Sequence, residues 1–452
     1  MNQNELVHYQ VGDPNEGPFV LVLNDGALIT AEDRAMLQAL YSRSPASVLN
    51  QLEKLAQSGS GKFMESFYVG YGHKSIGDCG HTTIFIENVS MLVAKAIQDS
   101  MLYDGQEVST RYIDFTTQPF VDPLEIKGDN PQDKLRAFYV KALPKLKEYL
   151  KSKYPLGEGE KESVYEKAIA ARAFDILRGF LPAGAQTCLA WTTNLRQAAD
   201  RLVQLQVHPL HEVRNVAEMI LEALKKAHPH SFNHKVYEAS ETYRSYYMQN
   251  GYYFEPLFFE KGIKLTHNSL DQDLLLLWKN LLQSRPQRTE LPKFLGEIGT
   301  LQFEFTLDFG SFRDIARQRA VIQRMPLLTV RHGFHEWYLN ELPEELFLEA
   351  CTLLQETKEW WWSQLHKKHN ITTQLQYYLP MGYRVPCRIV GDIPALVYLI
   401  ELRSGATVHA TLRELAQEMG AMVESLGIPL YVDRTESGRF DLKRGTQDIV
   451  QK

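Results

Sequence analysis

The sequence predicts an α+β protein built from two similar halves. Residues 181–219 and 379–419 both open on a Leu-Pro pair, and they are offset by 198 residues (379 minus 181). Around both segments, helical spacing of apolar residues dominates, and short segments rich in β-branched and aromatic residues lie between the helices. Each copy has polar residues where the other has apolar or unrelated ones. We therefore expect two degenerate halves that share one active site.

Length and composition are those of a globular protein. The chain has 452 residues, of which 44% are hydrophobic and 23% are charged, and typical domain sizes predict about two or three domains. The net charge of −6 argues against a nucleic-acid-binding protein. The sequence has no apolar run of about 18 residues and no basic start followed by an apolar stretch. We expect a cytoplasmic protein without a membrane partner.

Neither disulfides nor a metal site is expected. The cysteines are widely spaced and form no Cys-x-x-Cys pair, which predicts buried free thiols at Cys79, Cys188, Cys351 and Cys387. His332 and His335 are three residues apart beside Glu336, but the spacing suggests no further ligand. Metal binding is therefore not predicted.

Strands and helices alternate along the first half. A strand is expected over residues 20–24, between a proline and an Asp-Gly turn, and a second strand over 82–88 feeds a helix over 89–100. The apolar spacing of residues 31–55 predicts one helix that ends at the glycine-rich stretch 58–62. Further helices are expected over 132–151, 161–180, 194–207 and 211–226.

The second half repeats this order. A strand is expected over residues 301–309, a helix over 311–325 that ends before Pro326, and an apolar helix over 395–402. Between the halves, residues 232–295 are dense in aromatic residues, which argues against a disordered linker. These rings could stack on a planar ligand or form a strap that holds the halves together, and we favour the strap.

Several motifs occur in a fixed order along the chain. The first half contains GHKSIGDCGHTTIFIENV, then QEVSTRY at 106–112, ILRGFLP at 176–182 and TTNLR at 192–196. The second half contains RDIARQR at 313–319 and LIELRSGATVHATLRELAQEM at 399–419. In this order and with the duplication, the chain resembles a tandem, diverged form of the flavin-dependent thymidylate synthases.

The resemblance implies two tandem domains, residues 1–235 and 236–452, with an aromatic connector over 236–295. Each domain would be a small antiparallel sheet packed with helices, and the two would form a pseudo-dimer. Members of the family assemble as homotetramers whose nucleotide sites use more than one subunit. Two fused pairs would reproduce that assembly, so we expect a homodimer.

The same resemblance implies one composite nucleotide site. The first half keeps the Glu-x-Ser-x-Arg segment and the arginine before Leu-Pro, at Glu107, Ser109, Arg111 and Arg178. The second half keeps the Arg-x-Arg triplet, with glutamine at its centre, and the arginine of the Leu-Arg pair, at Arg317, Gln318, Arg319 and Arg403. The complementary positions are lost, because they hold Asp99, Ser100, Met101, Leu205 and Gln206 in the first half and Gln376, Asp392 and Pro394 in the second.

Flavin and pyrimidine contacts are also implied by the resemblance. The residues that match the flavin contacts of the family are His73, Ser75, Asn194, Arg196, Arg317 and Arg319. The arginine that matches Arg403 contacts the pyrimidine and favours ionisation at N3, so Arg403 is the catalytic candidate. No glycine-rich dinucleotide motif or P-loop competes for the cofactor.

The residues themselves leave other interpretations open. Arg111 and Arg178 could form a fork around a phosphate together with the Ser109 hydroxyl. Glu107 and Arg111 could instead be a solvated pair four residues apart on a helix, worth a few tenths of a kcal/mol. His73 could be a structural histidine.

The second-half arginines are open to two interpretations as well. Arg403 follows an apolar helix and needs a polar partner, which could be a ligand or a carboxylate, Glu401 or Glu414. On one regular helix, Arg313, Arg317 and Arg324 would share a face, and Arg319 would lie about 200° from Arg317. Both triplet arginines would then reach one ligand only if the helix ends or the ligand wraps around it.

The expected function is the reductive methylation of dUMP to dTMP. As the resemblance implies, methylenetetrahydrofolate supplies the carbon, reduced FAD carries it with the hydride, and NADPH reduces the flavin. No cysteine nucleophile is needed, because the protein binds, orients and polarises. Two alternatives stay open: methylation or hydroxymethylation of another pyrimidine nucleotide, and a non-catalytic flavin- or nucleotide-binding relic.

Overall fold

The chain forms two compact units that do not follow the repeat boundary. The computed structural model describes residues 7–23, 29–45, 47–110, 113, 115–254, 262–367 and 372–435. Unit 1 comprises Met1–Ile113 and Ala185–Tyr252, and unit 2 comprises Asp114–Gly184 and Tyr253–Lys452. Residues 114–184 of the first half are therefore packed together with the second half. The division of the chain into two compact units therefore differs from its division into two sequence halves at residue 235.

Unit 1 contains a five-stranded antiparallel sheet in the order β1-β2-β3-β5-β4. Its strands alternate between buried and more exposed residues along much of their length, as expected for a sheet with one face in the core. The strands expected over 20–24 and 82–88 are confirmed as β2 and β3. The strand bounds are β1 His8–Val11, β2 Phe19–Leu23, β3 His81–Ser90, β4 Asp104–Glu107 and β5 Gln186–Asn194.

The helices of unit 1 agree with the sequence prediction except at one place. The single helix expected over 31–55 is two helices, α1 and α2, because Pro45 lies between them and Ser47 caps the second by accepting a hydrogen bond from the Leu49 amide. Helix α8 packs on β1 and β2. The bounds are α1 Ala31–Tyr41, α2 Val48–Ser58, α3 Gly61–Phe63, the π-helix η2 Met64–Gly70, the 3-10 helix η3 Lys74–Cys79, α4 Met91–Gln98, α7 Leu195–Leu205, α8 His211–Ala227 and α9 Glu238–Tyr252.

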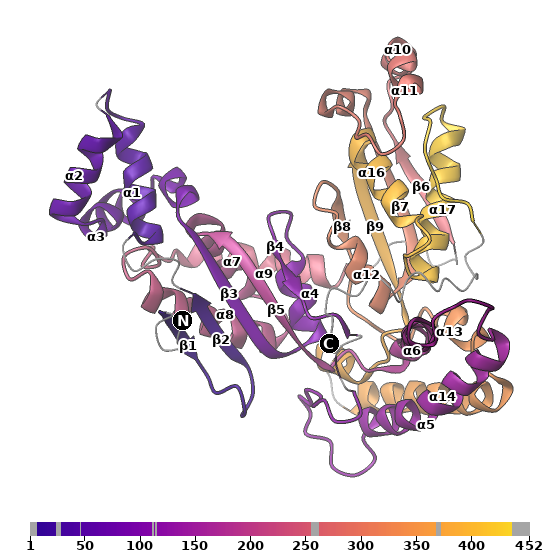
Figure 1. Ribbon diagram of the computed structural model, residues 1–452. Coiled ribbons are helices and arrows are strands. Elements are labelled where there is room, and N and C mark those ends of the chain that lie inside the picture. The colour runs from indigo at the N-terminus through magenta and orange to yellow at the C-terminus, as the bar shows by residue number, and fades with distance from the viewer. Residues whose placement is uncertain are drawn as a thin grey trace. The chain divides into compact units, whose positions relative to one another are not determined.

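Unit 2 contains a four-stranded antiparallel sheet in the order β6-β7-β9-β8. An α+β fold with a small antiparallel sheet in each unit is thus confirmed. Figure 1 shows α16 and α17 beside this sheet, and both contact its strands. The bounds are β6 Ile263–Asn268, β7 Thr300–Asp308, β8 Ile322–Arg324 and β9 Arg384–Asp392.

The helix predicted over 311–325 is wrong beyond its first turns. Helix α12 spans Phe309–Ile315, and the chain then turns and enters β8, which pairs with β9. The Gln323 side chain holds the turn by donating hydrogen bonds to the carbonyls of Ile315 at 2.9 Å and Gln318 at 2.8 Å. Backbone pairing in the sheet therefore overrides the helical spacing of the side chains. Arg324 lies on a strand and does not share a helix face with Arg313 and Arg317.

Two long helices of unit 2, α5 and α14, lie side by side and antiparallel (Figure 1). Their exposed faces are joined by ion pairs of Lys134 with Glu356, Lys141 with Glu349 and Lys145 with Glu345. The helix bounds in unit 2 are α5 Pro131–Lys153, α6 Glu162–Leu177, η5 Arg178–Phe180, α10 Gln272–Leu277, α11 Lys279–Ser284, η6 Lys293–Ile298, α12 Phe309–Ile315, α13 Glu336–Asn340, α14 Glu344–Lys367, α15 Thr372–Leu375, η7 Gln376–Tyr378, α16 Ile393–Arg403 and α17 Ala410–Ser425.

The two Leu-Pro segments pair with each other inside unit 2. Pro182 and Pro380 form an isolated antiparallel bridge, and their positions differ by the repeat offset of 198 residues. Each backbone hydrogen bond from one segment has a counterpart from the other at the same offset. These bonds run from the Ala183 amide to the Leu379 carbonyl, Met381 to Leu181, Gly184 to Tyr377 and Gly382 to Gly179. The pairing brings Arg178 beside elements of the second half.

The aromatic segment between the halves belongs to regular elements. It contributes α9 to unit 1 and β6, α10 and α11 to unit 2. The expectation that its rings pack is only partly correct, because no residue of α9 is fully buried and Tyr243 and Tyr246 are each 67% exposed. Residues 255–261 of this segment lie outside the described residues.

The cysteines are free thiols, as expected. Only Cys387 is buried, whereas Cys79, Cys188 and Cys351 are half-buried, so the prediction of burial holds for one of them. Within the described part of the chain, no helix has the length and apolarity needed to cross a membrane.

Candidate functional site

Arg178 is the centre of a charged cluster in unit 2. It begins η5, directly before the Leu-Pro pair, and its guanidinium donates a hydrogen bond to Ser311 Oγ at 3.3 Å, in the first turn of α12. Burial lowers the pKa of Arg178, but Tyr338, Asp175, Asp314 and Asp308 raise it above its ordinary value. The side chain therefore stays a cation. Its Nε is buried and has no hydrogen-bond partner among the described residues.

Asp308 anchors a buried polar network beside Arg178. As the N-cap of α12 it accepts a hydrogen bond from the Ser311 amide at 2.9 Å, and it accepts another from the Tyr338 hydroxyl at 2.8 Å. Burial raises the pKa of Asp308, but His409, His335 and Arg178 hold it below the ordinary value. Asp308 thus stays ionised in the core, facing the Arg178 cation.

His409 closes this network from α17. Its Nδ1 lies 2.9 Å from Thr411 Oγ1 and 3.3 Å from Ser311 Oγ, and its Nε2 lies 3.3 Å from the Asp175 carbonyl oxygen. Because a carbonyl only accepts, Nε2 carries the proton and Nδ1 accepts from the hydroxyls. Burial, with Arg178 nearby, lowers the pKa of His409 to about 3. The neutral imidazole is therefore the form that the folded protein holds.

This network predicts a loss of stability in mild acid. The unfolded state takes up a proton at His409 below its ordinary pKa of about 6.5, whereas the folded state does so only near 3. Stability from this residue is present above pH 6.5 and falls as the pH falls towards 3. Between pH 7 and pH 5 the loss is about 2 kcal/mol. Urea denaturation of His409→Gln at both pH values should show a smaller difference than the wild type shows, and an equal difference would contradict the assignment.

Arg403 and Arg178 share Asp314. Arg403 is the last residue of α16, and its guanidinium donates a hydrogen bond to the Asp314 carbonyl. Burial lowers the pKa of Arg403, and Asp314 opposes this while Arg317 adds to it. The Asp314 carboxylate also acts on Arg178. One candidate arginine from each half therefore interacts with Asp314, and Arg317 lies near enough to Arg403 to lower its pKa.

The ion pair considered for Arg403 with Glu401 is wrong. Glu401 forms its salt bridge with Arg285. The buried Nε of Arg403 has no hydrogen-bond partner among the residues that the structure describes. Arg178 and Arg403 thus each have a buried N–H donor without a partner among the described residues, which an anionic ligand would satisfy.

The Arg-x-Arg triplet lies in the turn after α12. Arg317 and Arg319 are exposed, whereas Gln318 between them is buried. On one continuous helix, Arg317 and Arg319 would point in nearly opposite directions. Because the helix ends at Ile315, before both residues, this obstacle to binding one ligand does not apply. The side chain at the centre of the triplet, Gln318, is therefore buried in the protein and is not presented to solvent.

The nucleotide-loop candidates of the first half belong to unit 1. Glu107 ends β4 and accepts a hydrogen bond from Gln98 Nε2 at 2.8 Å. This position in a strand excludes the helical ion pair with Arg111, which needs one continuous helix. Ser109 is exposed, and Arg111 lies outside the described residues.

The flavin candidates of the first half gather at one corner of unit 1. His73 and Ser75 are exposed at the start of η3, and Arg196 reaches Asp78 of the same element at 2.6 Å. Asn194 caps α7 by accepting a hydrogen bond from the Gln197 amide at 2.8 Å. The side-chain oxygen of Asn194 thus caps the helix, while its side-chain NH₂ group is a second hydrogen-bond donor near Arg196.

The lost positions of the second half have taken structural roles. Gln376, offset from Arg178 by 198 residues, is 1% exposed and accepts a hydrogen bond from the Leu328 amide at 2.8 Å. Asp392, the counterpart of Asn194, caps α16 through the Ala395 amide. Asn194 and Asp392 therefore share the role of helix cap in their two halves. The arginine before Leu-Pro, Arg178, occurs only in the first half.

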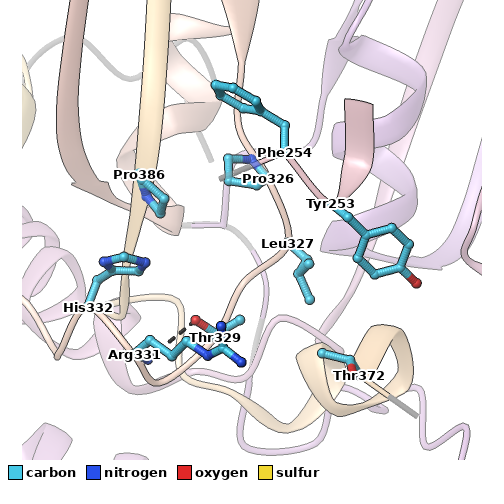
Figure 2. Close-up of a pocket in the computed structure, with 9 residues that line it drawn as sticks. All are labelled: Tyr253, Phe254, Pro326, Leu327, Thr329, Arg331, His332, Thr372 and Pro386. Carbon is cyan, nitrogen blue, oxygen red and sulfur yellow. Dashed lines mark hydrogen bonds between the residues drawn. The ribbon is translucent and has the colours of Figure 1, made fainter. Parts of the chain in front are cut away.

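Unit 2 has a pocket beside the segment that follows β8. This segment is the counterpart of the candidate nucleotide loop that follows β4 in the first half. Gln106 faces Ala190 and Arg324 faces Arg388, and positions 190 and 388 differ by the repeat offset. In this register Leu327 takes the place of Ser109. The cavity of about 230 Å³ is lined by Tyr253, Phe254, Pro326, Leu327, Thr329, Arg331, His332, Thr372 and Pro386 (Figure 2). Its wall combines apolar side chains with the donor groups of Arg331, His332 and Thr329.

The comparisons with known proteins match part of the chain to a family. Residues 29–230, a little under half of the sequence, match the family described as "Thymidylate synthase complementing protein". This part of the chain is similar to that family. The match includes His73, Glu107, Arg178 and Arg196. The resemblance seen in the motifs is thereby confirmed over the first half.

Similar proteins are known from Chlamydia and Thermoplasma species. A "UPF0159 protein" of Chlamydia muridarum is 27% identical over 78% of this chain and 76% of its own length. A protein of the same description from Chlamydia pneumoniae is 24% identical over the same shares. A "UPF0159 protein" of Thermoplasma acidophilum is 23% identical over 92% of this chain and 98% of its own length. The sequence similarity therefore extends over most of this chain, although these names assign no activity.

Sequence reasoning missed the carboxylates and the imidazole of the cluster. Asp314 lies within the quoted RDIARQR motif, and His409 lies within the repeat segment 379–419, but neither spacing marks them as neighbours of Arg178. No group of three or more potential metal ligands occurs among the described residues.

Proposed function

We propose that this protein is a flavin-dependent thymidylate synthase that converts dUMP to dTMP by reductive methylation. Methylenetetrahydrofolate is the carbon donor, FAD the cofactor and NADPH the reductant. The match of residues 29–230 to the thymidylate synthase complementing protein family supports a thymidylate synthase-related function. The specific reaction and its substrates are our proposal.

One observation carries the proposal. Arg178 of the first half and Arg403 of the second half both interact with Asp314 in unit 2. Each of the two has a buried Nε without a hydrogen-bond partner among the described residues. A nucleotide monophosphate is a planar, anionic ligand that suits fixed guanidinium groups. We assign Arg178 to the anionic groups of dUMP and Arg403 to its pyrimidine ring, where a cation favours the N3-ionised form.

The corner of unit 1 around His73, Ser75, Asn194 and Arg196 is assigned to FAD. A fixed guanidinium and an exposed imidazole suit the diphosphate and the planar ring of a flavin, and the Arg196 ion pair with Asp78 holds that guanidinium in place. When bound, the flavin supplies redox chemistry that no amino-acid side chain provides. The protein binds, orients and polarises.

Two measurements test the assignment together. The purified protein should show the absorbance bands of bound flavin, and its gene should rescue a thymidine-requiring bacterium. A protein that binds flavin and dUMP but does not rescue points to another pyrimidine nucleotide as substrate. A colourless protein that does not rescue would reject the proposal in favour of a non-catalytic relic.

A further inference from the structure

The pocket of unit 2 beside the segment after β8 has an apolar end and a polar end. Phe254, Pro326 and Pro386 lie at one end, and Thr329 and Arg331 lie at the other (Figure 2). Both prolines are buried, whereas Arg331 is exposed. The closed end of the pocket is therefore apolar, and its mouth carries a cation.

The pocket does not repeat the chemistry of the candidate nucleotide loop. The register that places Leu327 at the counterpart of Ser109 also places Thr329 at the counterpart of Arg111. The first replacement loses a hydroxyl group, and the second loses a guanidinium group. The cation of the pocket comes instead from Arg331, two residues further along the chain. A different ligand from a nucleotide is therefore expected.

The segment that forms the polar end is held in place by hydrogen bonds of its own backbone. The Leu328 amide donates to Gln376 Oε1 at 2.8 Å, and the Arg331 amide donates to Thr329 Oγ1 at 3.3 Å. A segment that is already ordered loses little conformational freedom when a ligand binds. The pocket is therefore preformed, as small-molecule sites usually are.

The Phe254 ring at the apolar end is also held in place. The guanidinium carbon of Arg324 lies 3.5 Å from the centroid of this ring, and that of Arg388 lies 4.5 Å from it. Arg388 is itself anchored by an ion pair with Glu304. A ring fixed between cationic groups offers a defined surface against which a second aromatic ring can pack.

Volume and charge together define the ligand. The cavity has a volume of about 230 Å³, and a cavity of about 150 Å³ is large enough for one benzene molecule. One aromatic ring with a small substituent therefore fits, whereas a base, a sugar and a phosphate together do not. Among the described residues that line the pocket none is acidic, while Arg331 and His332 supply nitrogen donors. The substituent that suits these donors is an anion.

We infer that this pocket binds a monocyclic aromatic carboxylate, with its ring beside Phe254 and the two prolines and its carboxylate at Arg331. A guanidinium group can donate two parallel hydrogen bonds to a carboxylate, which fixes the orientation of the ring inside the pocket. The pocket shares no residue with the sites assigned to dUMP and FAD. The inference therefore does not rest on the proposed function.

Calorimetric titration of the full-length protein with benzoate and with benzyl alcohol tests the inference. Both probes have one aromatic ring, and only benzoate is an anion. Benzoate should bind with a Kd on the order of 0.1 mM, as expected for a ligand of this size. It should bind about tenfold more tightly than benzyl alcohol, because it gains charge-assisted hydrogen bonds. Arg331→Gln should bring this ratio close to one, whereas Arg331→Lys should keep part of it.

Two further variants test the apolar end. Leu327→Trp should fill the cavity and abolish binding of both probes, with an unchanged circular dichroism spectrum. Phe254→Ala should weaken both probes by about fivefold through lost ring packing, and it serves as the test if Leu327→Trp does not fold. Lys358→Gln, on the exposed side of α14, is the matched control for the loss of one positive charge. It should leave both affinities at wild-type values.

Several outcomes would overturn the inference. A wild type that does not bind benzoate rejects it, and so does benzoate binding that is equal in the wild type and in the Arg331→Gln and Phe254→Ala variants. Saturating dUMP should leave the benzoate affinity unchanged. If dUMP displaces benzoate and Arg331→Gln weakens dUMP binding, the pocket belongs to the nucleotide site and the inference is wrong. A protein that binds benzoate as expected but forms no dTMP rejects the proposed function alone.

Discussion

Replacing Arg178 with glutamine is expected to abolish dTMP formation and to lower the free energy of unfolding by about 3 kcal/mol. Glutamine is the residue that the second half carries at the equivalent position, Gln376. The variant removes the cation that faces Asp175, Asp308 and Asp314. Buried carboxylates that lose their cation are costly because neither water nor a partner compensates them.

The loss of activity in Arg178→Gln should be larger than the fraction of unfolded protein accounts for. At a temperature where Arg178→Gln is still folded by circular dichroism, dUMP binding should be weakened by about 10²-fold, since a charge-assisted contact is lost. Urea denaturation and titration with dUMP provide the two measurements.

Arg172 offers a matched control on α6. It pairs with Glu341 at 2.9 Å, and both side chains are largely buried. Arg172→Gln should therefore also cost stability, while the folded variant keeps dUMP affinity. If the two variants lose affinity in parallel with folding, Arg178 has only a structural role.

Replacing Arg403 with alanine is expected to prevent rescue of a thymidine-requiring bacterium and to lower kcat/KM by about 10²- to 10³-fold. Its guanidinium is held by the Asp314 carbonyl and presents a buried Nε without a partner. A fixed donor of this kind stabilises charge that develops on the pyrimidine during the reaction. Steady-state kinetics should show the loss mainly in kcat, with a change in the pH profile of kcat.

The control for Arg403 is Asp99, which stands where the first half has lost its Arg-x-Arg triplet. Asp99 is exposed and pairs only with Lys95 of the same helix face at 3.3 Å among its described ion pairs. Asp99→Ala should support growth, whereas Arg403→Ala and Arg111→Ala should not. Equal effects of all three changes would contradict a single surviving site with residues from both halves.

The sequence predicted the repeat and most of its elements because their signals are local. The Leu-Pro pairs, the helices α5 to α8 and the strands β2, β3 and β7 follow from apolar spacing, caps and turn residues. It also singled out Arg178 as a site candidate, since an arginine that aligns with glutamine at the repeat offset marks a difference between the halves. These inferences need only residue types and distances along the chain.

The end of α12 shows where local signals fail. The helical spacing continues to Arg324, but pairing of β8 with β9 takes over after Ile315. That competition depends on a strand more than 60 residues away in sequence, Arg384–Asp392. No window of neighbouring residues contains the information.

What the sequence by itself determined was the pattern that predicts a duplication, with complementary residues lost in each copy. Only the tertiary structure decided that Arg178 packs in unit 2, that Asp314 interacts with both Arg178 and Arg403, and that His409 stays neutral beside Arg178. Electrostatic partners are chosen by distance in space, and the antiparallel pairing of Pro182 with Pro380 sets those distances.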